Sequence, residues 1–202
     1  MFRTILPALA IATAIALPAA PVFAETQPQH IRGTVESFGG STLTVHTREG
    51  DTATIGLGDK TIIAGVAAAK IADIMEGDFV GIASLPNEDG VAGALEVVIF
   101  PPAMKGSGEG SYGWDLKPKS TMTNATVANA VKDVDGSTVT VNYGGKEKKI
   151  VIPDGTPVVT ITEADRSDLV EGATVFVAAI KDGMTFGALQ VVVGKDGVVP
   201  PM

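Results

Sequence analysis

The chain has 202 residues, of which 45% are apolar and 19% charged, and its net charge is −8. It contains no cysteine, which excludes disulfides, cysteine-ligated zinc, iron–sulfur clusters and a thiol nucleophile. The acidic balance argues against nucleic-acid binding, because such proteins need a basic surface against the phosphates.

The first 24 residues have the pattern of a signal peptide. Arg3 gives a positive start, an apolar stretch follows over 5–23, and Val22 and Ala24 suit a cleavage site. Prolines interrupt this stretch, and its longest proline-free run, Ala8 to Leu17, is much shorter than the roughly 20 residues of a membrane span. We therefore expect cleavage after Ala24, a periplasmic location and no transmembrane segment in the mature chain.

Beyond Ala24, apolar and polar residues alternate with the period of two that is typical of half-buried antiparallel strands. Glycine-containing turns separate these stretches. One helix-like segment, Ala67 to Met75, precedes Gly77, where a helix C-cap favours a left-handed residue. In chain order we expect strands near 31–36, 43–46 and 53–57, a short helix over 67–75, and strands at 79–84 and 94–100.

The same order of motifs occurs twice. Residues 40–45 (GSTLTV) match 136–141 (GSTVTV), 75–80 match 170–175, and 93–99 (GALEVVI) match 187–193 (GALQVVV). The helix-like segment recurs as Glu163 to Val170, again followed by a glycine, Gly172. We expect a signal peptide at 1–24, a first repeat at 31–100, a Gly/Pro-rich linker at 101–126, a second repeat at 127–194 and a C-terminal tail at 195–202.

Each repeat therefore predicts five strands with a short helix between the third and the fourth, which is the order of an OB-type barrel. Closing such strands into a barrel also removes exposed strand edges. The expected fold class is all-β, with two tandem five-stranded OB-like β-barrels, each carrying a short helix between strands 3 and 4. A single open sandwich built from all the strands is the alternative.

The linker carries the first candidate binding site, formed by Tyr112, Trp114 and Glu109. Aromatic side chains on OB-type barrels stack sugars or bases, and Trp114 is the only tryptophan in the chain. The alternative is that Trp114 is a hydrophobic plug that holds the linker against a barrel.

Acidic residues form the second candidate site, after each helix-like segment. Carboxylate oxygens are the ligands that Ca²⁺ and Mg²⁺ prefer, so a divalent cation is the candidate ligand, and no other cofactor is expected. The alternative is that these acids are solvated surface groups. The candidate metal ligands are Asp73, Glu76 and Asp78 in the first repeat and Asp165, Asp168 and Glu171 in the second.

The repeat motifs resemble the domain-of-unknown-function 5666 family. The resemblance is carried by GTVES at 33–37, TLTV at 42–45, DIMEGDFV at 73–80 and ALEV at 94–97. It implies secreted, often tandem, OB-like β-barrel modules. The linker and the tail resemble a proteobacterial subgroup, some members of which are labelled metal-transporter permeases. That label conflicts with a mature chain that has no membrane span.

The expected function is that of a non-catalytic periplasmic binding module for a small ligand or a cation. The alternative is an envelope protein–protein adaptor or structural protein associated with metal transport. No enzyme activity is expected, because we find no serine–histidine–aspartate spacing or metalloprotease motif in the chain. The expected partner is an unknown small ligand or an envelope protein, and no nucleic acid.

Overall fold

The computed structural model describes residues 28–87, 91–133 and 136–201 and is all-β. The predicted signal peptide at 1–24 lies outside these residues. No helix in the described part of the chain is both long and apolar enough to cross a membrane. The strands are β1 (Gln29–Phe38), β2 (Thr42–Thr47), β3 (Thr52–Gly56), β4 (Ile62–Ala68), β5 (Phe79–Pro86), β6 (Ala92–Phe100), β7 (Gly110–Gly113), β8 (Thr121–Asp133), β9 (Gly136–Tyr143), β10 (Lys146–Pro153), β11 (Val158–Glu163), β12 (Thr174–Asp182) and β13 (Thr185–Gly194). Three single 3-10 turns are η1 (Ile71–Asp73), η2 (Pro102–Met104) and η3 (Arg166–Asp168).

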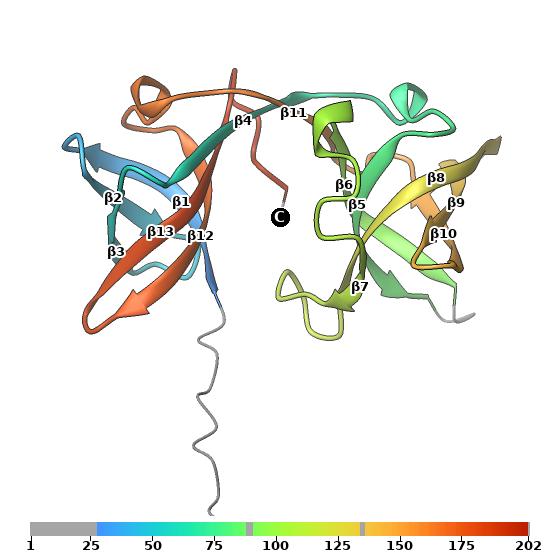
Figure 1. Ribbon diagram of the computed structural model, residues 1–202, viewed down its shortest axis with the longest axis horizontal. Helices are drawn as coiled ribbons and strands as arrows, with labels where there is room; N and C mark the ends of the chain where they lie inside the picture. Colours follow the sequence, from blue (N-terminus) through green and yellow to red (C-terminus); the bar gives the residue numbers. More distant parts are fainter. Residues whose placement is uncertain (1–27, 88–90, 134–135, 202) are drawn as a thin grey trace, which may run out of the picture.

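Ten of the strands close into two five-stranded barrels (Figure 1). Barrel 1 has the ring order β1-β2-β3-β13-β12, and barrel 2 has the order β8-β9-β10-β6-β5. In each ring, one parallel contact, β3 with β13 or β10 with β6, completes an otherwise antiparallel sheet. In barrel 1, three consecutive strands are followed by β12, which returns beside β1, and this is Greek-key order. Barrel 2 has an equivalent ring of pairings, but its β5 and β6 precede β8–β10 in the chain.

The two sequence repeats exchange strands between the barrels. Barrel 1 takes β1, β2 and β3 from the first repeat but β12 and β13 from the second. Barrel 2 takes β5 and β6 from the first repeat, β8 from the end of the linker and the start of the second repeat, and β9 and β10 from the second repeat. The expected tandem arrangement, in which each repeat closes its own barrel, therefore differs from the pairing in the structure.

Strands β4 and β11 carry the chain across between the barrels. They pair with each other antiparallel, with Val66 opposite Ile161, and span the top of the molecule in Figure 1. Each also extends a barrel sheet, because β4 pairs with β13 and β11 pairs with β6. The crossing strands thus join the two barrels into one continuous sheet.

The predicted helices at 67–75 and 163–170 are not formed. The chain there continues the crossing strand and then makes one 3-10 turn, η1 or η3. Alanines favour a helix, but the first residues of each segment, Ala67, Ala68 and Glu163, pair in the sheet formed by β4 and β11. Only the few residues that follow are left to form the single turn. The glycines that follow do take the left-handed conformation expected of them, with φ 90° at Gly77 and 85° at Gly172.

Each barrel has its own apolar core, and each core is capped by a residue that follows a 3-10 turn. Leu169, after η3, packs into barrel 1, and Ile74, after η1, packs into barrel 2. A third buried cluster lies between the barrels and fixes one against the other. It contains Val66, Val98, Val159, Phe176 and Val192, with Phe100, Trp114, Ile161, Ala178 and Val198 packed against it.

Candidate functional site: the cavity between the barrels

A cavity of about 510 Å³ lies between the two barrels. Its size is within the range of about 300 to 1,000 Å³ that is usual for small-molecule sites. One wall comes from β1, β2 and β12 of barrel 1, and the other comes from Glu96 on β6 of barrel 2 and from Pro157, just before the crossing strand β11. The linker and the C-terminal segment supply the rest. The lining residues are Arg32, Gly33, Thr34, His46, Thr47, Arg48, Gly50, Glu96, Leu116, Pro157, Thr174, Val175, Val199, Pro200 and Pro201.

A β-bulge in β6 points Glu96 at this cavity. The pairing of β5 with β6 shifts by one residue between Glu96 and Ala94, so that Leu95 is the extra residue. In a regular strand Ala94 and Glu96 would share a face. With the bulge, Ala94 and Val97 both face the core of barrel 2, while Glu96 faces barrel 1.

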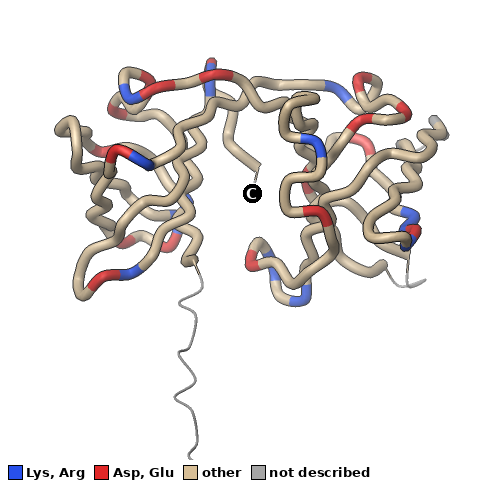
Figure 2. The backbone as a smooth tube through the Cα atoms, in the orientation of Figure 1, with Lys and Arg blue, Asp and Glu red and all other residues tan. Residues whose placement is uncertain are grey.

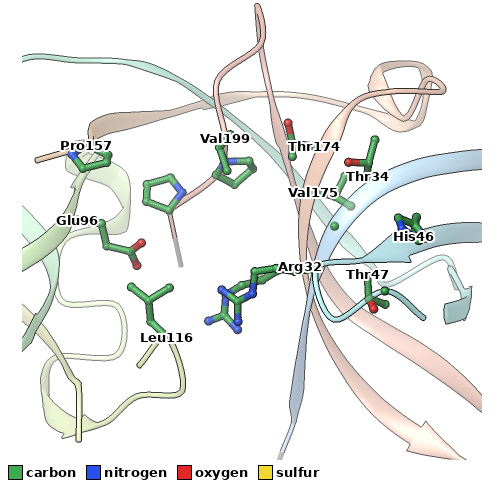
Figure 3. Close-up of a pocket in the computed structure, with 15 residues that line it drawn as sticks. Arg32, Thr34, His46, Thr47, Glu96, Leu116, Pro157, Thr174, Val175 and Val199 are labelled. Atoms are coloured by element: carbon green, nitrogen blue, oxygen red, sulfur yellow. The ribbon is translucent and has the colours of Figure 1, made fainter. Parts of the chain in front are cut away.

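Glu96 is a buried carboxyl group without a matching donor. Its side chain is 6% exposed, and its Oε1 atom has no hydrogen-bond partner among the described residues. Burial raises the pKa of Glu96 to about 7, although the positive charges of Arg32 and Arg48 act in the opposite direction. In Figure 3 the carboxyl group and the Arg32 side chain extend toward the same space from opposite walls. The cavity thus has a titratable carboxyl group on one wall and a positively charged guanidinium group on the opposite wall.

An ion-pair network connects Arg32 to the linker. Arg32 Nη2 donates to Asp115 at 2.7 Å, and His30 Nδ1 lies 3.0 Å from the other carboxylate oxygen of Asp115. Partial burial by itself would raise the pKa of Asp115, but the hydrogen bond and charge of Arg32, together with His30, hold it below its usual value. Residues 114–116 therefore form a wedge between the barrels.

Two of the predicted ligand-binding residues, Tyr112 and Trp114, line a second, smaller cavity of about 240 Å³ on the other side of this wedge. The Trp114 ring lies 4.5 Å from the His30 ring and 6.4 Å from that of Phe176, centroid to centroid. Its Nε1 atom is buried and has no hydrogen-bond partner within the described residues. Trp114 is therefore part of the packing between the barrels, which the plug interpretation anticipated.

Glu109, the third residue predicted for that site, lies elsewhere. Its side chain is exposed, and its Oε1 atom accepts a hydrogen bond of 2.7 Å from the backbone N–H of Gly144. It fastens the linker to the turn between β9 and β10. The structure therefore brings Tyr112 and Trp114 together but does not add Glu109 to them.

The predicted metal ligands of the first repeat bind backbone groups. Asp73 Oδ2 accepts from the N–H of Lys70, and Asp78 Oδ2 accepts from the N–H of Met75, both at 2.8 Å. Glu76 is exposed. Within residues 28–87, 91–133 and 136–201, no three His, Asp or Glu side chains are placed to hold a metal ion. Figure 2 shows acidic and basic residues interspersed over both barrels.

The second repeat uses its acids in the same way. Asp168 Oδ2 accepts from the N–H of Asp165, as Asp73 does for Lys70, and Asp168 also pairs with Lys195. Asp165 Oδ1 accepts from the backbone N–H and the hydroxyl of Ser167. The hydrogen bonds from Ser167 lower the pKa of Asp165, and those from Lys195 and from the backbone N–H of Asp165 lower the pKa of Asp168. Glu171 is exposed. Asp73 and Asp168 occupy matching positions because each holds the same turn.

The residues that dominate the larger cavity, Arg32, Arg48 and Glu96, were not among the predicted site residues. The sequence does carry one signal for Glu96, because it is the only charged residue in the apolar strand 92–100. The matching position of the second repeat is the uncharged isostere Gln190, which lines the smaller cavity. The two copies of this strand therefore differ in charge at one matching position.

Comparisons of the chain with models of protein families, with curated proteins and with solved structures found no match.

Proposed function

We propose that this protein is a non-catalytic binding protein of the periplasm that holds one small organic ligand in the cavity between its barrels. The observation that carries the proposal is Glu96, a buried carboxyl group with an unpartnered oxygen, placed in the wall of a cavity of about 510 Å³. Buried polar groups are normally hydrogen-bonded, and a bound ligand would supply the missing partner. The signal-peptide pattern of residues 1–24 supports the location.

The composition of the cavity favours binding over catalysis. Among the described residues that line it, Glu96 is the only carboxyl group, and its Oε1 atom has no hydrogen-bond partner. The imidazole of His46 lies 3.6 Å from Glu36 and is not paired with a nucleophilic side chain. Most of the remaining wall is apolar, as is usual for sites that retain a small molecule.

The adaptor alternative has less support. It depends on the linker as a docking element, but Trp114 packs between the barrels and Asp115 pairs with Arg32. Both side chains therefore already make contacts within this chain. A cation as ligand has less support as well, because the predicted acidic ligands hold turns.

The proposed family is that of the OB-like modules of the domain-of-unknown-function 5666 type. Two closed five-stranded barrels support this assignment, and barrel 1 has the Greek-key order along the chain that is typical of OB barrels. The exchange of strands between the repeats is the feature that departs from a simple tandem array.

The proposal is tested with N-phenyl-1-naphthylamine, an uncharged dye that brightens in apolar cavities. We expect saturable binding of one dye per chain, lost when Thr174→Trp fills the cavity and kept in the matched variant Thr54→Trp, on an exposed face of β3. The absence of saturable binding, or equal binding by both variants, would overturn the proposal. A thermal-unfolding scan of each variant verifies that it is folded.

A further inference from the structure

The charges around the cavity favour an anion. Barrel 1 contributes Arg32 and Arg48 to the wall, and barrel 2 contributes only Glu96. Asp115 offsets Arg32 through their ion pair. Arg48 also has an acidic neighbour, because its Nε atom donates to Glu49 at 3.3 Å, but both side chains of this pair are exposed, and the Arg48 Nη groups are left to bind an anion. Guanidinium groups bind carboxylates through paired, charge-assisted hydrogen bonds. A carboxylate therefore fits the polar side of the cavity.

The rest of the wall specifies the body of the ligand. Leu116, Pro157, Val175 and Val199 present apolar surface, and buried Pro200 lies beside Val199 in the tail. Apolar side chains of this kind stabilise a hydrocarbon by removing it from water. The volume accommodates a chain or ring system of about ten non-hydrogen atoms with room to spare.

We infer that the ligand is a small carboxylic acid with an apolar body, its carboxylate directed at Arg48 and Glu96 and its body against Leu116 and Val175. This inference rests on the proposed function, because it names the ligand class of the same cavity. It goes beyond that function in specifying charge and shape.

Glu96 has a defined part in this recognition. Ionised, it would repel a carboxylate; protonated, it donates a hydrogen bond to one and gains the partner it lacks. Because burial holds the pKa of Glu96 near 7, carboxylate binding draws a proton onto it at neutral pH and weakens as the pH rises. The charged and titratable groups that face Glu96 are Arg32 from β1, His46 from β2, Arg48 from the turn after β2, and Asp115 from the linker. β12 contributes Thr174 and Val175, which do not titrate in this range.

The test compares octanoate, octylamine and 1-octanol, which share a chain and differ in head group. Isothermal titration of the full mature chain at pH 6 should show octanoate binding at least about tenfold more tightly than the other two. Between pH 6 and 8.5 the octanoate Kd should rise by roughly thirtyfold, as the protonated fraction of Glu96 falls. Glu96→Gln, which copies the Gln190 of the second repeat, should bind octanoate with little pH dependence.

A second pair of variants distinguishes a specific contact with Arg48 from a general effect of positive charge. Arg48→Gln removes an exposed guanidinium of the cavity and should weaken octanoate about tenfold without changing 1-octanol. Lys149→Gln removes an exposed positive charge on β10 and should leave all three compounds unaffected.

The outcomes separate this inference from the proposed function. Preference for octylamine, equal binding of octanoate and 1-octanol, or pH dependence that persists in Glu96→Gln would each overturn the carboxylic-acid assignment. In those cases saturable dye binding would leave the proposed function standing. If neither the dye nor any octyl compound binds, both fail.

Discussion

At the residue scale, Glu96 costs the folded state stability. Its pKa is raised to about 7 in the folded protein from an ordinary value of 4.5, because burial disfavours the ionised form. The folded state thus keeps a proton that the unfolded state loses. Stability from this group is therefore greatest below pH 4.5, falls as the pH rises from 4.5 to 7, and is constant above that window. A residue retained at such a cost is consistent with a role in binding.

Glu96→Gln tests this linkage. The difference in unfolding free energy between the variant and the native protein should grow in favour of the variant by about 2.5 kcal/mol between pH 5 and pH 8. Urea unfolding at a series of pH values measures it. Glu76→Gln, at an exposed carboxyl group, is the matched control. A difference that stays constant with pH for Glu96→Gln would contradict the assigned burial effect.

At the scale of elements, the turns after β4 and β11 show why acids recur without making a metal site. In each turn an aspartate at the third position accepts a hydrogen bond from a backbone N–H three residues earlier, Asp73 from Lys70 and Asp168 from Asp165. Such bonds satisfy donors that a short turn leaves open. These turns also place Ile74 and Leu169 in the barrel cores.

Asp73→Ala should lower the unfolding free energy by about 1 kcal/mol, because one turn hydrogen bond is lost. Glu76→Ala, an exposed acid from the same predicted cluster, should have little effect. Thermal unfolding after chelation, and again with Ca²⁺ or Mg²⁺ added, should give the same melting temperature for the native protein. A selective rise with either ion, abolished by Asp73→Ala, would restore the cation hypothesis.

At the scale of the whole molecule, the two barrels have different relationships to the chain. All five strands of barrel 2 lie within 79–153, whereas barrel 1 joins β1–β3 to β12 and β13 from the far end of the sequence. Barrel 2 is therefore inserted into barrel 1. The units of folding do not coincide with the sequence repeats.

Fragments make this difference measurable. A fragment of residues 69–159 contains every strand of barrel 2 together with Ile74 and Val158 of its core, and it should fold by itself. A fragment of residues 28–100, the first repeat, lacks the strands that pair with β1 and β3 and should not fold cooperatively as a monomer. Circular dichroism and amide chemical-shift dispersion distinguish the two. Cooperative folding of 28–100 would show that a repeat can close its own barrel.

The sequence predicted strands of both barrels because alternation of apolar and polar residues is a local property, as along β2 and β3. It did not predict the crossing strands β4 and β11, whose pairing partners lie far away in the sequence. The exchange of strands was not predicted because the β5–β6 and β12–β13 hairpins have matching sequence patterns. Either hairpin could complete the barrel that β1–β3 begin or the barrel that β8–β10 begin. The place of Glu96 in the cavity was not predicted, for a related reason. Its burial depends on the opposite barrel, which no local pattern describes.

The position of Trp114 gives the protein an optical probe of the contact between its barrels. It is the only tryptophan in the chain, and its ring packs beside His30 and Phe176 of barrel 1 from a linker attached to barrel 2 through β7 and β8. Indole emission shifts to longer wavelength when the ring meets water. Its fluorescence therefore reports the parting of the barrels, while far-ultraviolet dichroism reports the strands within them. The two signals together separate loosening of the whole molecule from unfolding of its parts.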